Sequence, residues 1–318
     1  MVRVKRILKM KEIGVLIPLL LLWIITYTVN HAFFSSANMI SLFRTSSITL
    51  LGTLGAAFVF SCGMMDLSAG SVYALSGMVT AITMKNFGMP VIISILAGLV
   101  VGLLFGLLNG FIVNHFGIPA FIATLGTQYI ARGLSNVVSE GESITGFPDA
   151  FNKLGDFGLL NIPWSVYISL ALAVVAFAVF RYTTFGRSIL AVGGNQETAR
   201  VCGIKVKRVC STAFVISGVL SALAGVLSTA RLGTAQASAA TGWEMTIIAA
   251  AIIGGVSMFG GSVSILGAFI GVVLMETLTI SMTMLKVNAY WQRVAIGIVI
   301  VLAVGIDTYR RKKMSGGK

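Results

Sequence analysis

The sequence predicts an all-α polytopic membrane protein with about ten transmembrane helices. Its composition is 57% hydrophobic and only 10% charged, whereas soluble domains carry about 25% charged residues. Many uncharged windows reach about 18 residues or more, which is the length that crosses a bilayer. The basic residues gather in a few places along the chain, as they do on the cytoplasmic side of membrane proteins. A soluble fold accommodates one such apolar helix, but not many in succession.

Apolar length and the polar residues between apolar runs define ten expected spans, within one domain that covers residues 1–318. The spans cover approximately 13–30, 40–62, 68–84, 90–109, 119–138, 163–181, 209–230, 245–258, 262–283 and 289–306. The first follows a basic segment and resembles a signal peptide. No A-x-A cleavage pattern comes after it, so we expect it to remain as a helix. The least certain spans are 40–62, which contains Arg44, and 245–258, which is short.

The distribution of charge predicts the orientation. Of the 23 basic residues, 16 lie in three places. They are Arg3, Lys5, Arg6, Lys9 and Lys11; Arg181, Arg187, Arg200, Lys205, Lys207 and Arg208; and Arg310, Arg311, Lys312, Lys313 and Lys318. An even number of spans puts both termini and the loop 182–208 on one side, which the positive-inside rule makes cytoplasmic. The loop 139–162 then lies outside, and it carries four acids against one lysine. The net charge of +13 follows this topology and does not indicate nucleic acid as a partner.

The residues that carry catalytic or metal chemistry are sparse. Cys62, Cys202 and Cys210 do not have the spacing of a metal site or a disulfide framework. His31 and His115 lie far apart in the sequence, and a G-x-x-x-x-G-K-[ST] phosphate loop is absent. We therefore expect no catalytic residue, no metal and no cofactor bound by this chain, which argues against an integral membrane enzyme.

One polar stretch, FGRSILAVGGNQETARVCGIKVKRV at 185–209, interrupts the apolar sequence. It predicts a short helix over about 195–202, with Asn195 as the N-cap, Glu197 in the first turn and Gly203 at the C-terminal end. Gly193 and Gly194 are expected to shape the turn into that helix. A helix of two turns is not stable alone in water, so it packs on its own loops or on a partner protein.

Two short segments are similar to each other. GSVYALSG at 70–77 resembles GSVSILGA at 261–268, and each follows a break that contains glycine. Internal repeats are common in transporters. A repeat and a shared bias toward glycine and serine both explain a match of this length.

Polar residues inside the apolar frame are candidates for a substrate pathway or gate. A buried acid such as Asp66 is costly in a membrane and marks a cavity, a partner or a function. Asp66 is expected to cap the segment that begins at Leu67 or to act as a gate; direct contact with a solute and proton coupling are the alternatives. Asn109, Thr124 and Gln128, with Phe121 as an apolar wall, are further candidates. Hydrogen bonding between helices is the alternative role of these polar groups.

Long motifs in the sequence resemble the monosaccharide (ribose-type) branch of the ABC importer permeases. GMMDLSAGS resembles that branch's G-G-I-D-L-S-V-G-S, and PAFIATLGTQYIARG resembles its P-A-F-I-A-T-L-…-R-G. AVGGNQETARVCGIKV and GWEMTIIAAAIIGGVSMFGG resemble two further motifs of the branch. ETARVCG is similar to the E-A-A-x-x-x-G cytoplasmic signature, although Thr198 replaces alanine and the apolar-proline ending is missing. The resemblance covers nearly the whole chain in order.

The resemblance implies a partner arrangement in the cytoplasmic membrane of a prokaryote. Two permease chains, in a homodimer or a heterodimer, would form the pathway, and an ABC ATPase, often a fused tandem, would bind ATP and Mg on the cytoplasmic face. An extracytoplasmic sugar-binding protein would deliver the substrate. The residues implied to couple to the ATPase are Gly193, Gly194, Asn195, Glu197, Ala199, Arg200 and Gly203. Arg231 and Glu244 are expected to pair with each other or to face the binding protein.

Two other kinds of transporter remain open at this point. A secondary transporter driven by an ion gradient needs ionisable residues in relay within the membrane, and these are sparse here. An export permease would work without an external binding protein.

Overall fold

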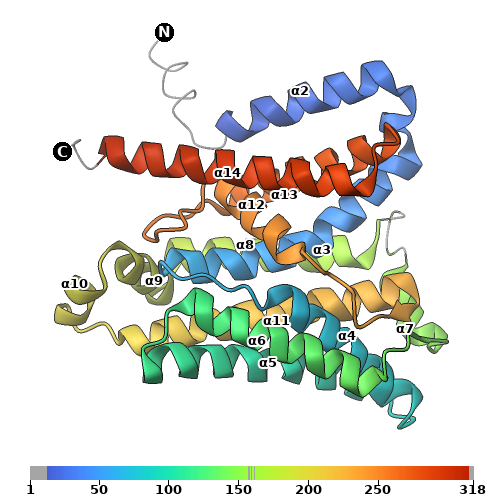
Figure 1. Ribbon diagram of the computed structural model, residues 1–318, viewed down its shortest axis with the longest axis horizontal. Helices are drawn as coiled ribbons and strands as arrows, with labels where there is room; N and C mark the ends of the chain where they lie inside the picture. The colour runs from blue at the N-terminus through green and yellow to red at the C-terminus, as the bar shows by residue number, and fades with distance from the viewer. Residues whose placement is uncertain (1–12, 157, 159, 161, 315–318) are drawn as a thin grey trace.

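The computed structural model describes residues 13–156, 158, 160 and 162–314, and helices dominate it (Figure 1). The longer helices are α2 (Ile13–Val29), α3 (Ser36–Ser61), α4 (Ala69–Lys85), α5 (Val91–Phe116), α6 (Ala120–Ser139), α8 (Trp164–Tyr182), α11 (Val206–Leu232), α12 (Trp243–Ile253), α13 (Ile265–Met284) and α14 (Ala289–Met314). The shorter ones are η1 (His31–Phe34), α7 (Asp149–Gly155), α9 (Thr184–Gly194) and α10 (Gln196–Val201). Strands β1 (Ile144–Thr145) and β2 (Thr234–Ala235) pair antiparallel. The basic residues expected at 3–11 and Lys318 lie outside the described residues.

The chain is an all-α polytopic membrane protein. In the described part of the chain, five helices are long and apolar enough to cross a membrane: α3, α5, α8, α11 and α13. Shorter apolar stretches lie in α2, α12 and α14. Exposed apolar side chains cover the outer faces, as Leu104 in α5 (57% exposed) and Val174 in α8 (68% exposed) illustrate. Apolar surface of this extent is suited to contact with lipid.

One expected span is shorter in the structure than the sequence predicts. The span expected at 245–258 is the helix α12, which ends at Ile253 and has only 11 residues. Crossing a bilayer takes about 20 residues. The helix stops because Gly255 takes a left-handed conformation, with φ of 86°. Figure 1 shows α12 beginning near the middle of the molecule, and α4 likewise begins there after the non-helical segment 62–68.

The two ends of the molecule differ in what they carry. Figure 1 places the start of α2, the end of α14 and the α9–α10 pair at one end, and α7 at the opposite end. This arrangement agrees with a loop 182–208 on the same side as both termini and a loop 139–162 on the other side. The second loop contains β1, which joins it to β2 after α11.

Glycines let the central helices approach closely. α11 packs against α3, α4 and α5, and Gly102 and Gly106 of α5 lie against its backbone. A Cβ added at Gly102 would overlap Gly218 O, and one added at Gly106 would lie 2.6 Å from Phe214 O. Because apolar side chains gain nothing by leaving lipid, this close backbone packing holds the helices together.

We predict that Gly102→Ala lowers the thermal stability of the protein in detergent, by about 1–3 kcal/mol, because the added methyl group overpacks the α5–α11 contact. Gly126→Ala is the matched control, since nothing lies within 4 Å of a Cβ added there. Melting temperatures followed by intrinsic fluorescence check the prediction. Equal melting temperatures for the two variants would show that the α5–α11 contact is not tightly packed.

Candidate functional site

The polar stretch at 182–208 folds into two short helices, α9 and α10, where the sequence predicts one. An apolar stripe explains the extra helix, because Ile189 and Val192 of α9 are buried. Gly193 and Gly194 are therefore the last residues of α9 and do not form a separate turn into α10. The predicted cap of α10 is confirmed: the Thr198 N–H donates to Asn195 Oδ1 at 2.9 Å.

α10 stands out from the end of the molecule with a charged and apolar surface. Glu197 and Arg200 form an ion pair of 2.9 Å on exposed side chains. Ala199 is buried against the rest of the loop, whereas Val201 is 87% exposed. Gly203 follows with φ of 82°, which ends the helix as the sequence predicts. A short helix that exposes both charges and an apolar side chain is suited to contact with a partner.

The end of α9 is packed tightly between two helix breaks. A Cβ added at Gly193 would overlap Ser61 O and lie 2.6 Å from Gly261 N and 2.9 Å from Gly260 Cα. The Gly261 N–H donates to Ser61 O at 3.2 Å. We call this contact of Gly193, Ser61, Gly260 and Gly261 the glycine junction. It joins α9 to the end of α3 and to the loop between α12 and α13, so the two breaks noted in the sequence meet here.

Asp66 lies at the centre of a buried hydrogen-bond network. Its Oδ1 accepts from the Ser68 N–H at 2.9 Å and the Ser68 O–H at 2.6 Å, and its Oδ2 accepts from Ser217 at 2.8 Å. Asn109 Nδ2 donates to Ser68 Oγ at 2.9 Å, and Thr127 donates to Asn109 Oδ1 at 2.6 Å. The network ties the start of α4 to α5, α6 and α11.

The expected capping role of Asp66 requires a correction. α4 begins at Ala69 with Ser68 at the N-cap position, so no helix starts at Leu67. Asp66 bonds the backbone two residues ahead, which fixes a turn before the helix. Thr124 holds the same segment from α6: its Oγ1 accepts from the Leu67 N–H at 3.1 Å and lies 2.8 Å from Ala120 O.

A cavity opens beside α10. Its volume is about 720 Å³, and it lies between the segment 63–67, the α5–α6 connection and the start of α11. Phe121 lines it, and Arg200 and Lys207 contribute positive charge. The cavity connects the surface near α10 with the segment that Asp66 and Thr124 hold.

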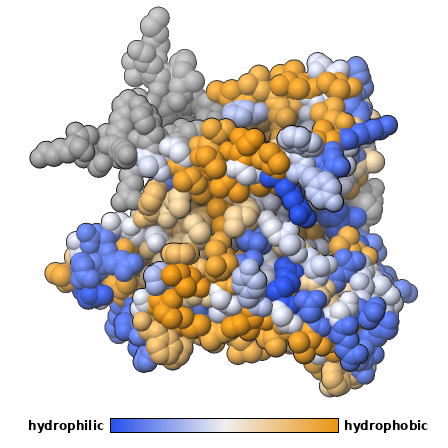
Figure 2. Space-filling model, in the orientation of Figure 1, coloured by the Kyte–Doolittle hydropathy of each residue, from blue (hydrophilic) through white to orange (hydrophobic). Residues whose placement is uncertain are grey.

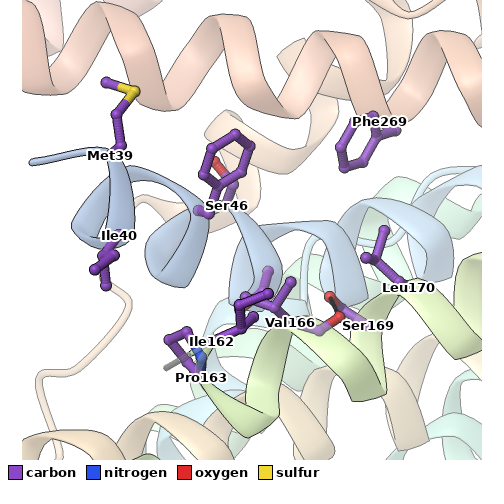
Figure 3. A pocket seen from close by; sticks show the side chains of 11 residues that line it. Met39, Ile40, Ser46, Ile162, Pro163, Val166, Ser169, Leu170 and Phe269 are labelled. Atoms are coloured by element: carbon purple, nitrogen blue, oxygen red, sulfur yellow. Dashed lines mark hydrogen bonds between the residues drawn. The ribbon is translucent and has the colours of Figure 1, made fainter. Parts of the chain in front are cut away.

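A second pocket lies between α3, α8 and α13 (Figure 3). Its volume is about 320 Å³, and its lining includes Met39, Ile162 and Phe269. Of its hydroxyl groups, that of Ser47 is bonded to Ser165 at 2.8 Å. Because the lining is almost wholly apolar, this pocket does not supply the hydrogen-bond partners that a sugar requires.

Arg231 and Glu244 do not pair with each other in the described part of the chain. Arg231 donates to Thr45 Oγ1 at 3.3 Å. Glu244 is only 6% exposed and accepts from Gln128 Nε2 at 3.0 Å. The short length of α12 explains this burial, because its first turn lies inside the bundle.

Arg132 has a structural role that the sequence did not predict. Its guanidinium donates to Ala237 O at 2.5 Å and to Ala239 O at 2.7 Å, which fastens the segment before α12 to α6. The sequence offered one indication of this role, because a cation within an apolar span is costly and usually has a specific partner.

Within the described residues, no cluster of three or more potential metal ligands occurs.

Sequence similarity assigns the chain to a known family. Residues 38–304 match the family described as branched-chain amino acid transport system / permease component. The chain belongs to this permease family. It is 40% identical to the D-allose transport system permease protein of Escherichia coli, over 86% of this chain and 84% of that protein. It is 36% identical to the ribose import permease protein of Haemophilus influenzae, over 92% of each chain.

A further relative is the L-arabinose transport system permease protein of Escherichia coli, which is 33% identical over 95% of this chain and 92% of that protein. No solved structure matches the chain. Ribose, allose and arabinose permeases are thus homologues over most of its length, and the chain is a membrane permease of the sugar ABC transporter class.

We predict that Asp66→Asn destabilises the protein by about 1–3 kcal/mol, because the amide keeps the volume but cannot accept from three donors. Thermal unfolding in detergent measures the change. Glu142→Gln, which alters an exposed acid, is expected to leave the melting temperature unchanged. If both variants have the melting temperature of the wild type, the network does not stabilise the start of α4.

Proposed function

We propose that the chain is the transmembrane subunit of an ATP-driven importer that moves a monosaccharide across the cytoplasmic membrane of a prokaryote. A separate ABC ATPase, which binds ATP and Mg, supplies the energy, and an external binding protein delivers the sugar. The observation that carries this proposal is the α9–α10 pair, which protrudes from one end of the molecule and contacts two helix breaks through the glycine junction.

α10 is the element that docks on the ATPase. The capping bond at Asn195 and the left-handed Gly203 define a short, rigid helix. Its ion pair contributes little to stability because both side chains are exposed, so Glu197 and Arg200 are available to a partner. Val201 adds an exposed apolar contact. These features favour a protein partner over a purely solvated loop.

The glycine junction carries the motion of α9 into the membrane domain. Gly193 touches backbone on both sides, and backbone contacts transmit displacement without a flexible side chain between them. A movement of α9 therefore acts on the end of α3 and on the α12–α13 loop together. These segments lead to α4 and α13, which line the interior of the bundle.

The sugar leaves through the cavity beside α10, past Phe121. Asn109 and Thr124 are bonded within the bundle, so they shape the path by holding the segment 62–68 in place. The relatives are named for ribose, allose and arabinose, which share a polyhydroxylated ring. A substrate of this chemical class is the one that we assign to this chain.

The opposite end of the molecule faces the binding protein. It carries α7, the β1–β2 pair and the exposed acids Glu140, Glu142, Asp149 and Asp156. Arg231 lies near it at the end of α11. A second permease chain, identical or similar, completes the pathway.

We test the proposal with the permease reconstituted in liposomes together with its ATPase and binding protein. Gly193→Ala is expected to reduce ATP-driven sugar uptake by about tenfold, because the methyl group forces the α9–α3 contact apart. Gly194→Ala is the matched control, since a Cβ added there has nothing within 4 Å. Uptake of radiolabelled D-ribose, D-allose and L-arabinose is measured at fixed ATP.

Two results would contradict the proposal. One is uptake by the permease alone, driven by an ion gradient, without any bound ATPase. The other is equal uptake by the Gly193→Ala and Gly194→Ala complexes, which would show that coupling does not pass through the glycine junction.

A further inference from the structure

Two helices that begin inside the bundle meet at their first residues. α4 begins at Ala69 and α12 at Trp243, both near the middle of the molecule (Figure 1). A Cβ added at Gly70 would overlap Glu244 Oε2 and lie 2.7 Å from Ala240 O, so the two starts are in close contact. Discontinuous helices that begin near the bilayer midplane commonly form the substrate sites of transporters.

The carboxylate of Glu244 is incompletely bonded at this place. Its Oε1 accepts from Gln128 Nε2 at 3.0 Å. Its Oε2 is buried and has no hydrogen-bond donor among the described residues. A buried acceptor without a donor is unfavourable. A hydroxyl group that arrives from outside the chain would satisfy it.

The groups around Glu244 are of the kind that bind a sugar. Gln128 is half-buried and has both donors and an acceptor. Arg132, also half-buried, interacts electrostatically with Glu244 while the carbonyls of Ala237 and Ala239 hold it in position. A carboxylate, an amide and a guanidinium provide hydrogen-bond partners for the hydroxyls of a monosaccharide.

The start of α12 is open to the molecular surface. Thr241, Gly242 and Met245 are exposed on either side of the buried Glu244. Figure 2 shows hydrophilic residues near the centre of this face, with apolar residues above and below them. In the orientation of Figure 1, that region lies between α12 and α6. The exposed residues Thr241 and Gly242 thus bring the molecular surface next to the buried carboxylate.

We propose that Glu244, Gln128 and Arg132 form a sugar-recognition site at the start of α12, in which Glu244 Oε2 accepts a hydrogen bond from a monosaccharide hydroxyl. The assignment rests on the proposed transport function. This proposal assigns Glu244 to the transport pathway and not to the surface that faces the binding protein, since its side chain is buried inside the bundle. Arg132 orients the site through its bonds to the segment before α12.

Saturation-transfer NMR on the permease–ATPase complex in nanodiscs tests the site, with D-ribose, D-allose and L-arabinose as probes and no binding protein present. Glu244→Gln is expected to weaken the signal of the sugar that binds the wild type about tenfold, through loss of one charged hydrogen bond. Glu276→Gln is the matched control. It alters a carboxylate that is equally buried, bonded to Thr49 and outside the site, and it is expected to retain the signal. Loss of the signal in both variants, or in neither, would overturn the proposal.

Transport measurements separate failure of the site from failure of the proposed function. The Glu244→Gln complex is expected to hydrolyse ATP in response to the binding protein but to move about tenfold less sugar per ATP. Gln128→Met, at a half-buried position, is expected to give the same loss. If the wild type transports sugar and both variants transport equally well, the site is wrong and the function stands. If the wild type shows no ATP-driven uptake, the proposed function itself fails.

Discussion

The close contact of three backbone segments at Gly193 is the constraint on which the account of this permease depends. A side chain at this position would overlap Ser61 O and the backbone of Gly260 and Gly261. The contact therefore exists only because α9 ends in glycine. It brings the polar loop, the end of α3 and the α12–α13 break into one place, so the protruding α9–α10 pair and the interrupted helices of the membrane domain are in direct contact.

Irregular backbone inside a membrane requires internal hydrogen bonds, because lipid supplies none. The segment 62–68 has them: Asp66 bonds Ser68 and Ser217, and Thr124 bonds the Leu67 N–H. The segment before α12 is held in the same way by Arg132. Both irregular segments precede helices that start inside the bundle. Polar residues of this apolar chain thus stabilise both of these irregular segments, and the cavity beside α10 forms next to the segment 62–68.

Sequence patterns predicted the features that depend on local chemistry. Apolar length predicted α3, α5, α8, α11 and α13, and the capping preference of asparagine predicted the start of α10. They did not predict that α12 stops after 11 residues, because GG in an apolar run is compatible with either a continuing helix or a break. The contacts of Glu244 with Gln128 and of Asp66 with Ser217 were also not predictable, since each joins helices more than 100 residues apart in the sequence.

The most direct test of the central claim is a distance measurement by electron paramagnetic resonance. Cys202 at the end of α10 is exposed whereas Cys62 and Cys210 are buried, so a spin label reaches the natural Cys202. A second label at Thr241→Cys reports on the start of α12. In the reconstituted complex, the account predicts that the distance between the labels shifts when ATP is bound and trapped with vanadate. An unchanged distance in a complex that actively transports sugar would contradict it.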